Sequence, residues 1–111
     1  MNDVITELAE LLEQRKSSDS SKSYVASLHE KGLNKILQKV GEESAETILA
    51  AKDCVSDDNE SKNAVIHETA DLWFHTMVML SHLDLRPEQV LEELQKRFNI
   101  SGLEEKASRK N

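Results

Sequence analysis

AVIHETADLWFHTMVMLSHL, residues 64–83, is the stretch of this sequence that decides the fold. Its apolar residues fall on nearly every side of a helix, which is typical of a helix at the centre of a bundle. No alternating apolar and polar run anywhere in the chain indicates a strand. We therefore predict an all-α fold in which residues 63–83 form a buried helix.

Four further helices are predicted around this one by apolar stripes at helical spacing, with turn residues or serine-rich segments between them. Their expected ranges are residues 3–16, 24–31, 33–55 and 87–98. Gly41 lies inside the third of these ranges at a cost of about 1 kcal/mol, and Pro87 suits the first position of the last helix. The sequence thus predicts a single domain over residues 1–111, a bundle of four to five helices with residues 101–111 as a peripheral tail.

Composition narrows the class of function. A formal charge of −7 in 111 residues argues against nonspecific nucleic-acid binding and against an anionic membrane surface. No apolar stretch reaches transmembrane length, the N-terminus lacks a signal pattern, and the single Cys54 fits a reducing compartment. We expect a cytoplasmic protein that binds neither nucleic acid nor membrane. Long helices in so short a chain often bury apolar surface against another subunit, so we also expect an oligomer.

Two pairs of acidic residues at helical spacing indicate a metal site. Glu43 and Glu46 lie three apart in one predicted helix, and Glu68 and Asp71 lie three apart in the buried one. Residues three apart share a helix face, so each pair can direct two carboxylates at one spot. Four converging carboxylates repel one another without a cation, and an all-oxygen site suits Mg²⁺ or Mn²⁺ better than zinc. This arrangement favours metal-assisted chemistry on a phosphate.

The two pairs differ in how strongly they point to a metal. Glu43 with Glu46 alone would more often be a solvated helix face, whereas Glu68 and Asp71 on a buried helix need a partner. On a helical projection Glu43 falls at the edge of the apolar stripe, which makes it the better candidate for a direct ligand. Its neighbour Glu42 is a candidate either for a residue that supports the direct metal ligands or for a general base.

Cationic and imidazole side chains accompany the acids. Lys35 and Lys39 share the polar face with Glu42 and could neutralise phosphate charge, or they could only pair with the glutamates of that face. His67 and His75 flank the second acidic pair, but a histidine on a mostly apolar helix is more often a hydrogen-bonded core residue than a ligand. The chain has no His-Glu-x-x-His motif, no glycine-rich phosphate loop and no Gly-x-Ser-x-Gly motif.

Four segments carry a resemblance to a known family. KVGEESAE at residues 39–46 and HETADLWFH at residues 67–75 resemble the acidic motifs of phosphoribosyl-ATP pyrophosphohydrolases, which are all-α, MazG-like nucleoside triphosphate pyrophosphohydrolases. SYVASL at residues 23–28 and RFNISGLEEKASR at residues 97–109 resemble that family's more specific outer segments. The resemblance covers nearly the whole chain. Val25 and Ser44 stand where the family often carries threonine and alanine.

The resemblance implies a reaction. It is the hydrolysis of 1-(5-phospho-β-D-ribosyl)-ATP to the corresponding AMP compound and pyrophosphate, the second step of L-histidine biosynthesis, by Mg²⁺-activated attack of water on the α–β phosphoanhydride. The family also implies a homodimer whose helices complete the bundle. Its metal-binding acids correspond to Glu43, Glu46, Glu68 and Asp71. Glu42 could accept the proton of the water as the catalytic base, and the candidate phosphate ligands are Lys35, Lys39 and Arg97.

Two other interpretations remain open at this point. A related MazG-like or dUTPase-like nucleotide pyrophosphohydrolase would share the four acids and differ in its base and sugar pocket. A noncatalytic helical dimerisation module would carry the same acids as surface charge. Metal binding distinguishes the second alternative, because a solvated acidic face gains no stability from millimolar Mg²⁺ beyond a general salt effect.

Overall fold

The computed structural model describes residues 3–99, and these residues form five helices without a strand. The helices are α1 (Asp3–Arg15), α2 (Tyr24–Lys31), α3 (Leu33–Lys52), α4 (Asn59–His82) and α5 (Pro87–Asn99). The predicted all-α class is therefore confirmed. None of these helices combines the length and the apolar character that crossing a bilayer requires.

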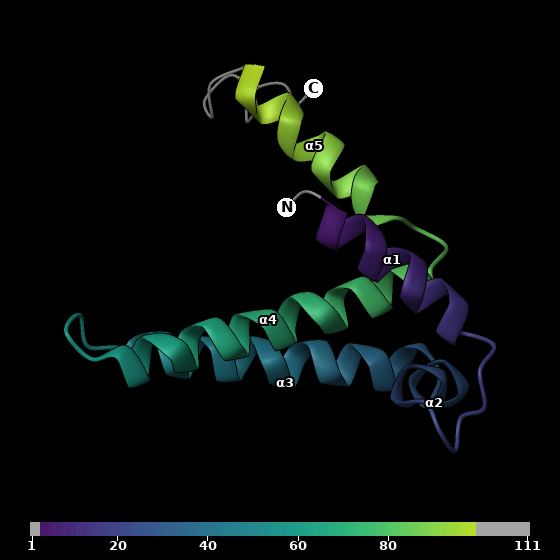
Figure 1. The fold of residues 1–111 in the computed structure, drawn as a ribbon, viewed down its shortest axis with the longest axis horizontal. Coiled ribbons are helices and arrows are strands. Elements are labelled where there is room, and N and C mark those ends of the chain that lie inside the picture. The colour runs from purple at the N-terminus through teal and green to yellow at the C-terminus, as the bar shows by residue number, and fades with distance from the viewer. Residues whose placement is uncertain (1–2, 100–111) are drawn as a thin grey trace.

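The longest two helices, α3 and α4, lie side by side and antiparallel (Figure 1). A short turn joins them at one end of this hairpin, and α2 packs at the opposite end. Helix α1 crosses the C-terminal half of α4, while α5 contacts α1 and extends away from the hairpin (Figure 1). The hairpin is thus the element against which the other helices are placed.

Three local features set the ends of these helices. The side chain of Ser23 accepts a hydrogen bond from the Ala26 amide and caps α2, and Asp58 caps α4 in the same way through Glu60. Gly32 separates α2 from α3 with a φ of 98°, a left-handed conformation that other residues rarely adopt. The chain therefore turns sharply at this glycine, and α2 comes to lie across the end of the hairpin.

The core lies where the first four helices meet. The least exposed large side chains are Leu12 from α1, Leu28 from α2, Ile36 from α3 and Val78 from α4, each with 1% or less of its surface accessible. Three more buried apolar side chains complete this cluster, namely Ala9, Val25 and Met77. Packing is consequently concentrated at the α2 end of the hairpin.

The prediction that the helix of residues 63–83 is buried on all sides is wrong for the isolated chain. Ile66 is 66% exposed and Trp73 is 61% exposed, and full burial begins only at His75. The physical reason is the arrangement of the helices, because the N-terminal half of α4 lies beside α3 alone among the described residues (Figure 1). An apolar helix surface remains open along this half.

Residues 101–111, predicted to be a peripheral tail, lie outside the described residues, as does most of the C-terminal segment at residues 97–109 that resembles the family. The described helix boundaries agree with the predicted ranges to within a few residues. Helix α3 runs through Gly41 without a break and ends at Lys52, before the predicted end at residue 55. Helix α4 begins at Asn59, one turn before the predicted start.

Candidate metal centre

Three carboxylates from two helices come together in the middle of the hairpin. Glu43 of α3 and Glu68 and Asp71 of α4 each offer an oxygen, and these oxygens lie within 4.8 Å of one another. The two residues of α4 are three apart and so share a face, and the antiparallel packing of α3 brings Glu43 against that face. The structure thus joins three of the four acids that the sequence analysis selected.

The burial of these carboxylate oxygens and their lack of hydrogen-bond partners suit a bound cation. Glu43 is only 7% exposed, and its Oε2 atom is buried without a hydrogen-bond partner among residues 3–99. Oε1 of Glu68 is buried without a partner in the same part of the chain. A buried carboxylate oxygen with no donor carries a large desolvation cost, which a bound cation offsets. Because every donor is a carboxylate oxygen, the residues present fit Mg²⁺ or Mn²⁺.

Electrostatics at Glu43 lead to the same conclusion. Burial raises the pKa of the Glu43 carboxyl above its ordinary value, and the neighbouring carboxylates of Glu46 and Asp71 raise it further, while His75 acts in the opposite direction. A carboxyl in such surroundings is costly to ionise unless positive charge is brought to it. A divalent cation would provide that charge.

The fourth predicted acid lies at the edge of this cluster. Glu46 is exposed and is not one of the three residues whose oxygens converge, yet it is close enough to Glu43 to affect its pKa. Glu42, the candidate base, is also exposed, and its Oε1 atom lies 3.7 Å from Nζ of Lys39. Both side chains are therefore open to solvent beside the buried acids.

A threonine that the sequence analysis did not select ties the two helices together at the cluster. The hydroxyl of Thr47 lies 2.7 Å from the main-chain oxygen of Glu43 and 3.1 Å from that of Glu68. It therefore links the backbones of two acids on different helices. The available signal was its position four residues after Glu43, on the same face of α3.

Two further residues lie beside the acids, and the sequence analysis gave neither a role in the site. The Tyr24 hydroxyl of α2 is 2.8 Å from Nε2 of His75, and Nδ1 of His75 is 2.8 Å from the main-chain oxygen of Asp71. His75 is thus a hydrogen-bonded core histidine, the more common of the two roles considered for it. The second histidine, His67, is exposed and places Nε2 at 3.4 Å from Oδ2 of Asp71.

Comparison with known families gives one finding. Residues 5–98 match the family model described as phosphoribosyl-ATP pyrophosphohydrolase. The chain belongs to this family. The match spans the described helices almost completely and confirms the resemblance seen in the sequence. Membership supports a pyrophosphohydrolase of histidine biosynthesis that acts on phosphoribosyl-ATP.

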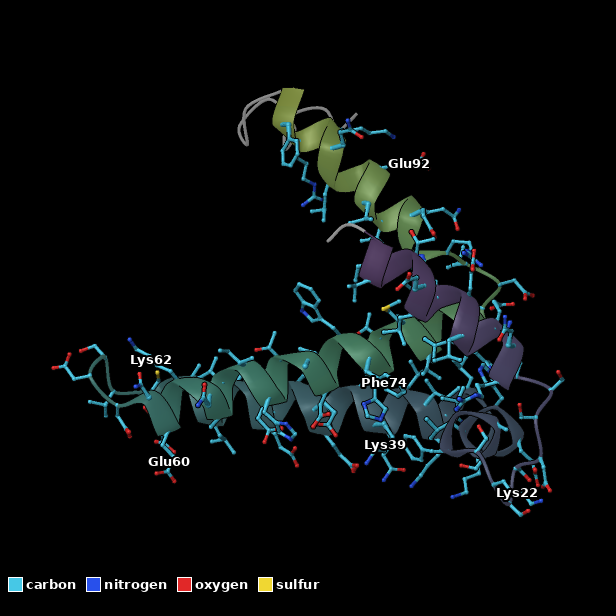
Figure 2. All side chains as sticks on the ribbon, viewed as in Figure 1. Lys22, Lys39, Glu60, Lys62, Phe74 and Glu92 are labelled. Carbon is cyan, nitrogen blue, oxygen red and sulfur yellow. The ribbon has the colours of Figure 1, made fainter. Side chains whose placement is uncertain are left out.

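A phosphoribosyl-ATP pyrophosphohydrolase must also hold several phosphates, and the predicted cationic residues lie in different places. Lys39 and Phe74 both lie toward the α2 end of the hairpin (Figure 2). They are far from Glu60 and Lys62, which lie at the turn of the hairpin (Figure 2). Lys35 is one turn before Lys39 on α3. Arg97 is in the last turn of α5 and pairs with Glu93 at 3.9 Å. Because α5 extends away from the hairpin, the structure does not bring Arg97 to the acids of its own chain.

Proposed function

We propose that this chain hydrolyses 1-(5-phospho-β-D-ribosyl)-ATP to 1-(5-phospho-β-D-ribosyl)-AMP and pyrophosphate in the cytoplasm, with Mg²⁺ as its cofactor and Mn²⁺ as a substitute. The observation that carries the proposal is the convergence of Glu43, Glu68 and Asp71 in a chain of this family. The family match supports the substrate. The unpartnered carboxylate oxygens support the metal.

The metal would be held by Glu43, Glu68 and Asp71, with Glu46 reaching in from the rim. A bound divalent cation neutralises phosphate oxygens and makes a bound water more acidic. The chain itself supplies the rigid placement of these ligands, since Thr47 joins the backbones of Glu43 and Glu68. Ligands held in this way need little rearrangement when they bind.

Proton transfer and phosphate binding fall to exposed residues of α3 in this proposal. Glu42 accepts the proton of the attacking water, and Nζ of Lys39 lies 3.7 Å from its Oε1 atom. Lys35 and Lys39 bind phosphate oxygens from the same helix. Arg97 serves as a phosphate ligand only at the site of a partner copy, because α5 leads away from its own acid cluster (Figure 1).

The active form is a homodimer in this proposal, with a second copy of the chain covering an apolar groove. The groove has a volume of about 470 Å³ and lies between the hairpin and the pair α1 and α5. Its walls are almost entirely apolar, and the residues that line it include Ile5, Val40, Leu72, Trp73, Leu91 and Leu94.

A second copy is the occupant best supported by the exposed surface of the hairpin. Ile48, Ile66 and Trp73 are each more than 60% exposed, although they lie on the two longest helices. One chain therefore presents an apolar groove and further exposed apolar side chains on the hairpin, which two identical copies can bury mutually around a two-fold axis. Such pairing would cover the half of α4 that its own chain leaves open.

The direct test is pyrophosphate release from phosphoribosyl-ATP. With millimolar Mg²⁺ we expect release that EDTA abolishes and that Glu68→Gln lowers by about a hundredfold, the upper end of what loss of even an outer partner of a metal ligand costs. ATP and dUTP serve as comparison substrates. Release from dUTP in preference to phosphoribosyl-ATP would replace the substrate, and no metal-dependent release from any nucleotide would refute the proposal.

A further inference from the structure

Tyr24 and His75 make a contact that the proposed reaction leaves without a role. The phenol hydroxyl and Nε2 of the imidazole are 2.8 Å apart, and the two rings meet edge to face with centroids 5.8 Å apart. His75 is buried at 6% exposure, whereas Tyr24 is 51% exposed. The contact therefore runs from a buried position on α4 to the open side of α2.

The direction of each hydrogen bond in this contact follows from its partners when the His75 ring is neutral. The main-chain oxygen of Asp71 can only accept, so Nδ1 of His75 must carry a proton and donate it. Nε2 of the neutral ring is then an acceptor, and the Tyr24 hydroxyl donates its only proton to it. The phenol oxygen has lone pairs left and no proton, so toward any other group it acts as an acceptor only.

The surroundings of the phenol are those of the acid cluster. Burial raises the pKa of the Tyr24 phenol, Lys39 lowers it, and the carboxylates of Glu43, Glu42 and Asp71 raise it. The hydroxyl is also connected to Asp71 through His75, whose ring contacts both the phenol oxygen and the Asp71 main-chain oxygen. An acceptor oxygen in this place suits the ammonium group of Lys39 or a water hydrogen, and it repels a phosphate oxygen.

We propose that Tyr24 and His75 are positioning residues of the metal centre, whose mutual hydrogen bond fixes α2 against α4 and holds an acceptor oxygen beside Glu43 and Asp71. The phenol orders Lys39 and site water and does not itself bind phosphate. Asp71 is also positioned through its main chain, because Nδ1 of the same His75 ring donates a hydrogen bond to the Asp71 carbonyl oxygen. The inference rests on the metal site of the proposed function.

Mn²⁺ binding to the full-length chain tests this role without turnover. Free and bound Mn²⁺ are separated by electron paramagnetic resonance for the wild type, Tyr24→Phe, His75→Leu and the double variant. Tyr24→Phe keeps the ring and removes the hydroxyl, that is, both the donated proton and the acceptor oxygen. We expect Mn²⁺ affinity about tenfold lower, as for other outer partners of metal ligands. The double variant should bind no more weakly than His75→Leu alone, since both changes break one contact.

Two more variants separate positioning from general damage. His75→Gln places an amide oxygen near the position of Nε2 and should recover more Mn²⁺ affinity than His75→Leu. Ser27→Ala is the matched control on α2, because its hydroxyl bonds only the main-chain oxygen of Tyr24 at 2.6 Å. We expect Ser27→Ala to bind Mn²⁺ as the wild type does.

Each outcome is decisive. A purely structural contact would lower the metal-free melting temperature of Tyr24→Phe and leave its Mn²⁺ affinity unchanged, and this result would overturn the inference alone. A wild type that binds no Mn²⁺ would overturn the metal site and, with it, the proposed function. Should His75→Leu fail to fold, the comparison of Tyr24→Phe with His75→Gln still gives the answer.

Discussion

Glu43 is the residue at which the requirements of folding and of the proposed metal site conflict. Its carboxyl is buried, one oxygen has no partner among residues 3–99, and two other carboxylates are near enough to raise its pKa. In the metal-free protein this arrangement opposes folding at neutral pH. A bound cation would stabilise these same carboxylates, because it would offset both their burial and their mutual repulsion.

Replacing Glu43 by Gln should therefore separate the two effects. Without metal, we expect the variant to be at least as stable as the wild type, because a buried charge is removed. With Mg²⁺ at ten times its dissociation constant, the wild type should gain about 1.4 kcal/mol and the variant almost nothing. Thermal unfolding with and without Mg²⁺ measures this, with exposed Glu7→Gln on α1 as the control. A variant that gained as much as the wild type would remove Glu43 from the ligand set.

Thr47 permits a second prediction at this scale. Thr47→Val keeps the shape of the side chain and removes the hydroxyl that joins the carbonyls of Glu43 and Glu68. We expect a loss of about 1 kcal/mol in the free energy of unfolding, measured with urea. Thr69→Val is the matched control, since its hydroxyl bonds only the Val65 carbonyl of its own helix. Equal losses in the two variants would mean that the link between helices adds nothing.

At the scale of elements, α2 is joined to α4 by a polar contact near each of its ends. Tyr24 meets His75 near the start of α2, and His29 meets His82 near its end, with the two Nδ1 atoms 2.8 Å apart and the rings stacked. One Nδ1 must donate and the other must accept, so this second contact requires at least one neutral ring. Protonating both rings would break it.

This requirement predicts how stability depends on pH. Burial, the charge of His82 and Lys16 lower the pKa of His29, while Glu13 raises it. Between this lowered pKa and the unfolded value near 6.5, the unfolded chain binds more protons, so stability falls as pH falls. We expect the urea-derived free energy of unfolding to drop between pH 7.5 and 5.5, and to drop less in His29→Gln.

Exposed His67 provides the comparison for that experiment. His67→Gln should retain the pH dependence of the wild type, because this side chain is 73% exposed and its ion pair is with Asp71 of its own helix. A pH dependence that persisted unchanged in His29→Gln would assign it to other groups.

The elements also show why the sequence predicted some features and missed others. Gly32 and Pro87 mark helix ends through local backbone chemistry, so those boundaries were predictable. The spacing of Glu68 and Asp71 placed them on one face, which is also a local property. The contact of Tyr24 with His75 depends on the angle that Gly32 imposes between α2 and α3, and no local pattern encodes that angle. The partial exposure of α4 was missed because periodicity does not indicate which chain covers an apolar face.

At the scale of the whole molecule, residues 3–99 form a bundle that leaves apolar surface uncovered. The core uses one end of the hairpin, while a groove of about 470 Å³ and several large apolar side chains remain open. Exposed apolar surface of this extent on a small protein is typical of an association site. This is the structural basis of the proposed dimer.

Trp73→Glu tests that association. The tryptophan lines the groove and is 61% exposed, so a charge there should be accepted by the single chain and rejected by a dry interface. By sedimentation equilibrium at micromolar concentration, we expect the wild type at the mass of a dimer and the variant at the mass of a monomer. Val55→Glu, in the turn between α3 and α4, should remain a dimer. A monomeric wild type would refute the assembly.

The turn between α3 and α4 has a consequence for how the site can vary. It joins the helices at residues 53–58, and at a rise of about 1.5 Å per residue it lies roughly 14 Å along α3 from Glu43. All three converging acids come from one helix pair that is continuous in sequence, so the site has a low contact order and can assemble early in folding. Insertions in this turn add only a small loop-closure entropy. The length of the hairpin tip is therefore free to change while the three acids of the proposed metal site stay in register.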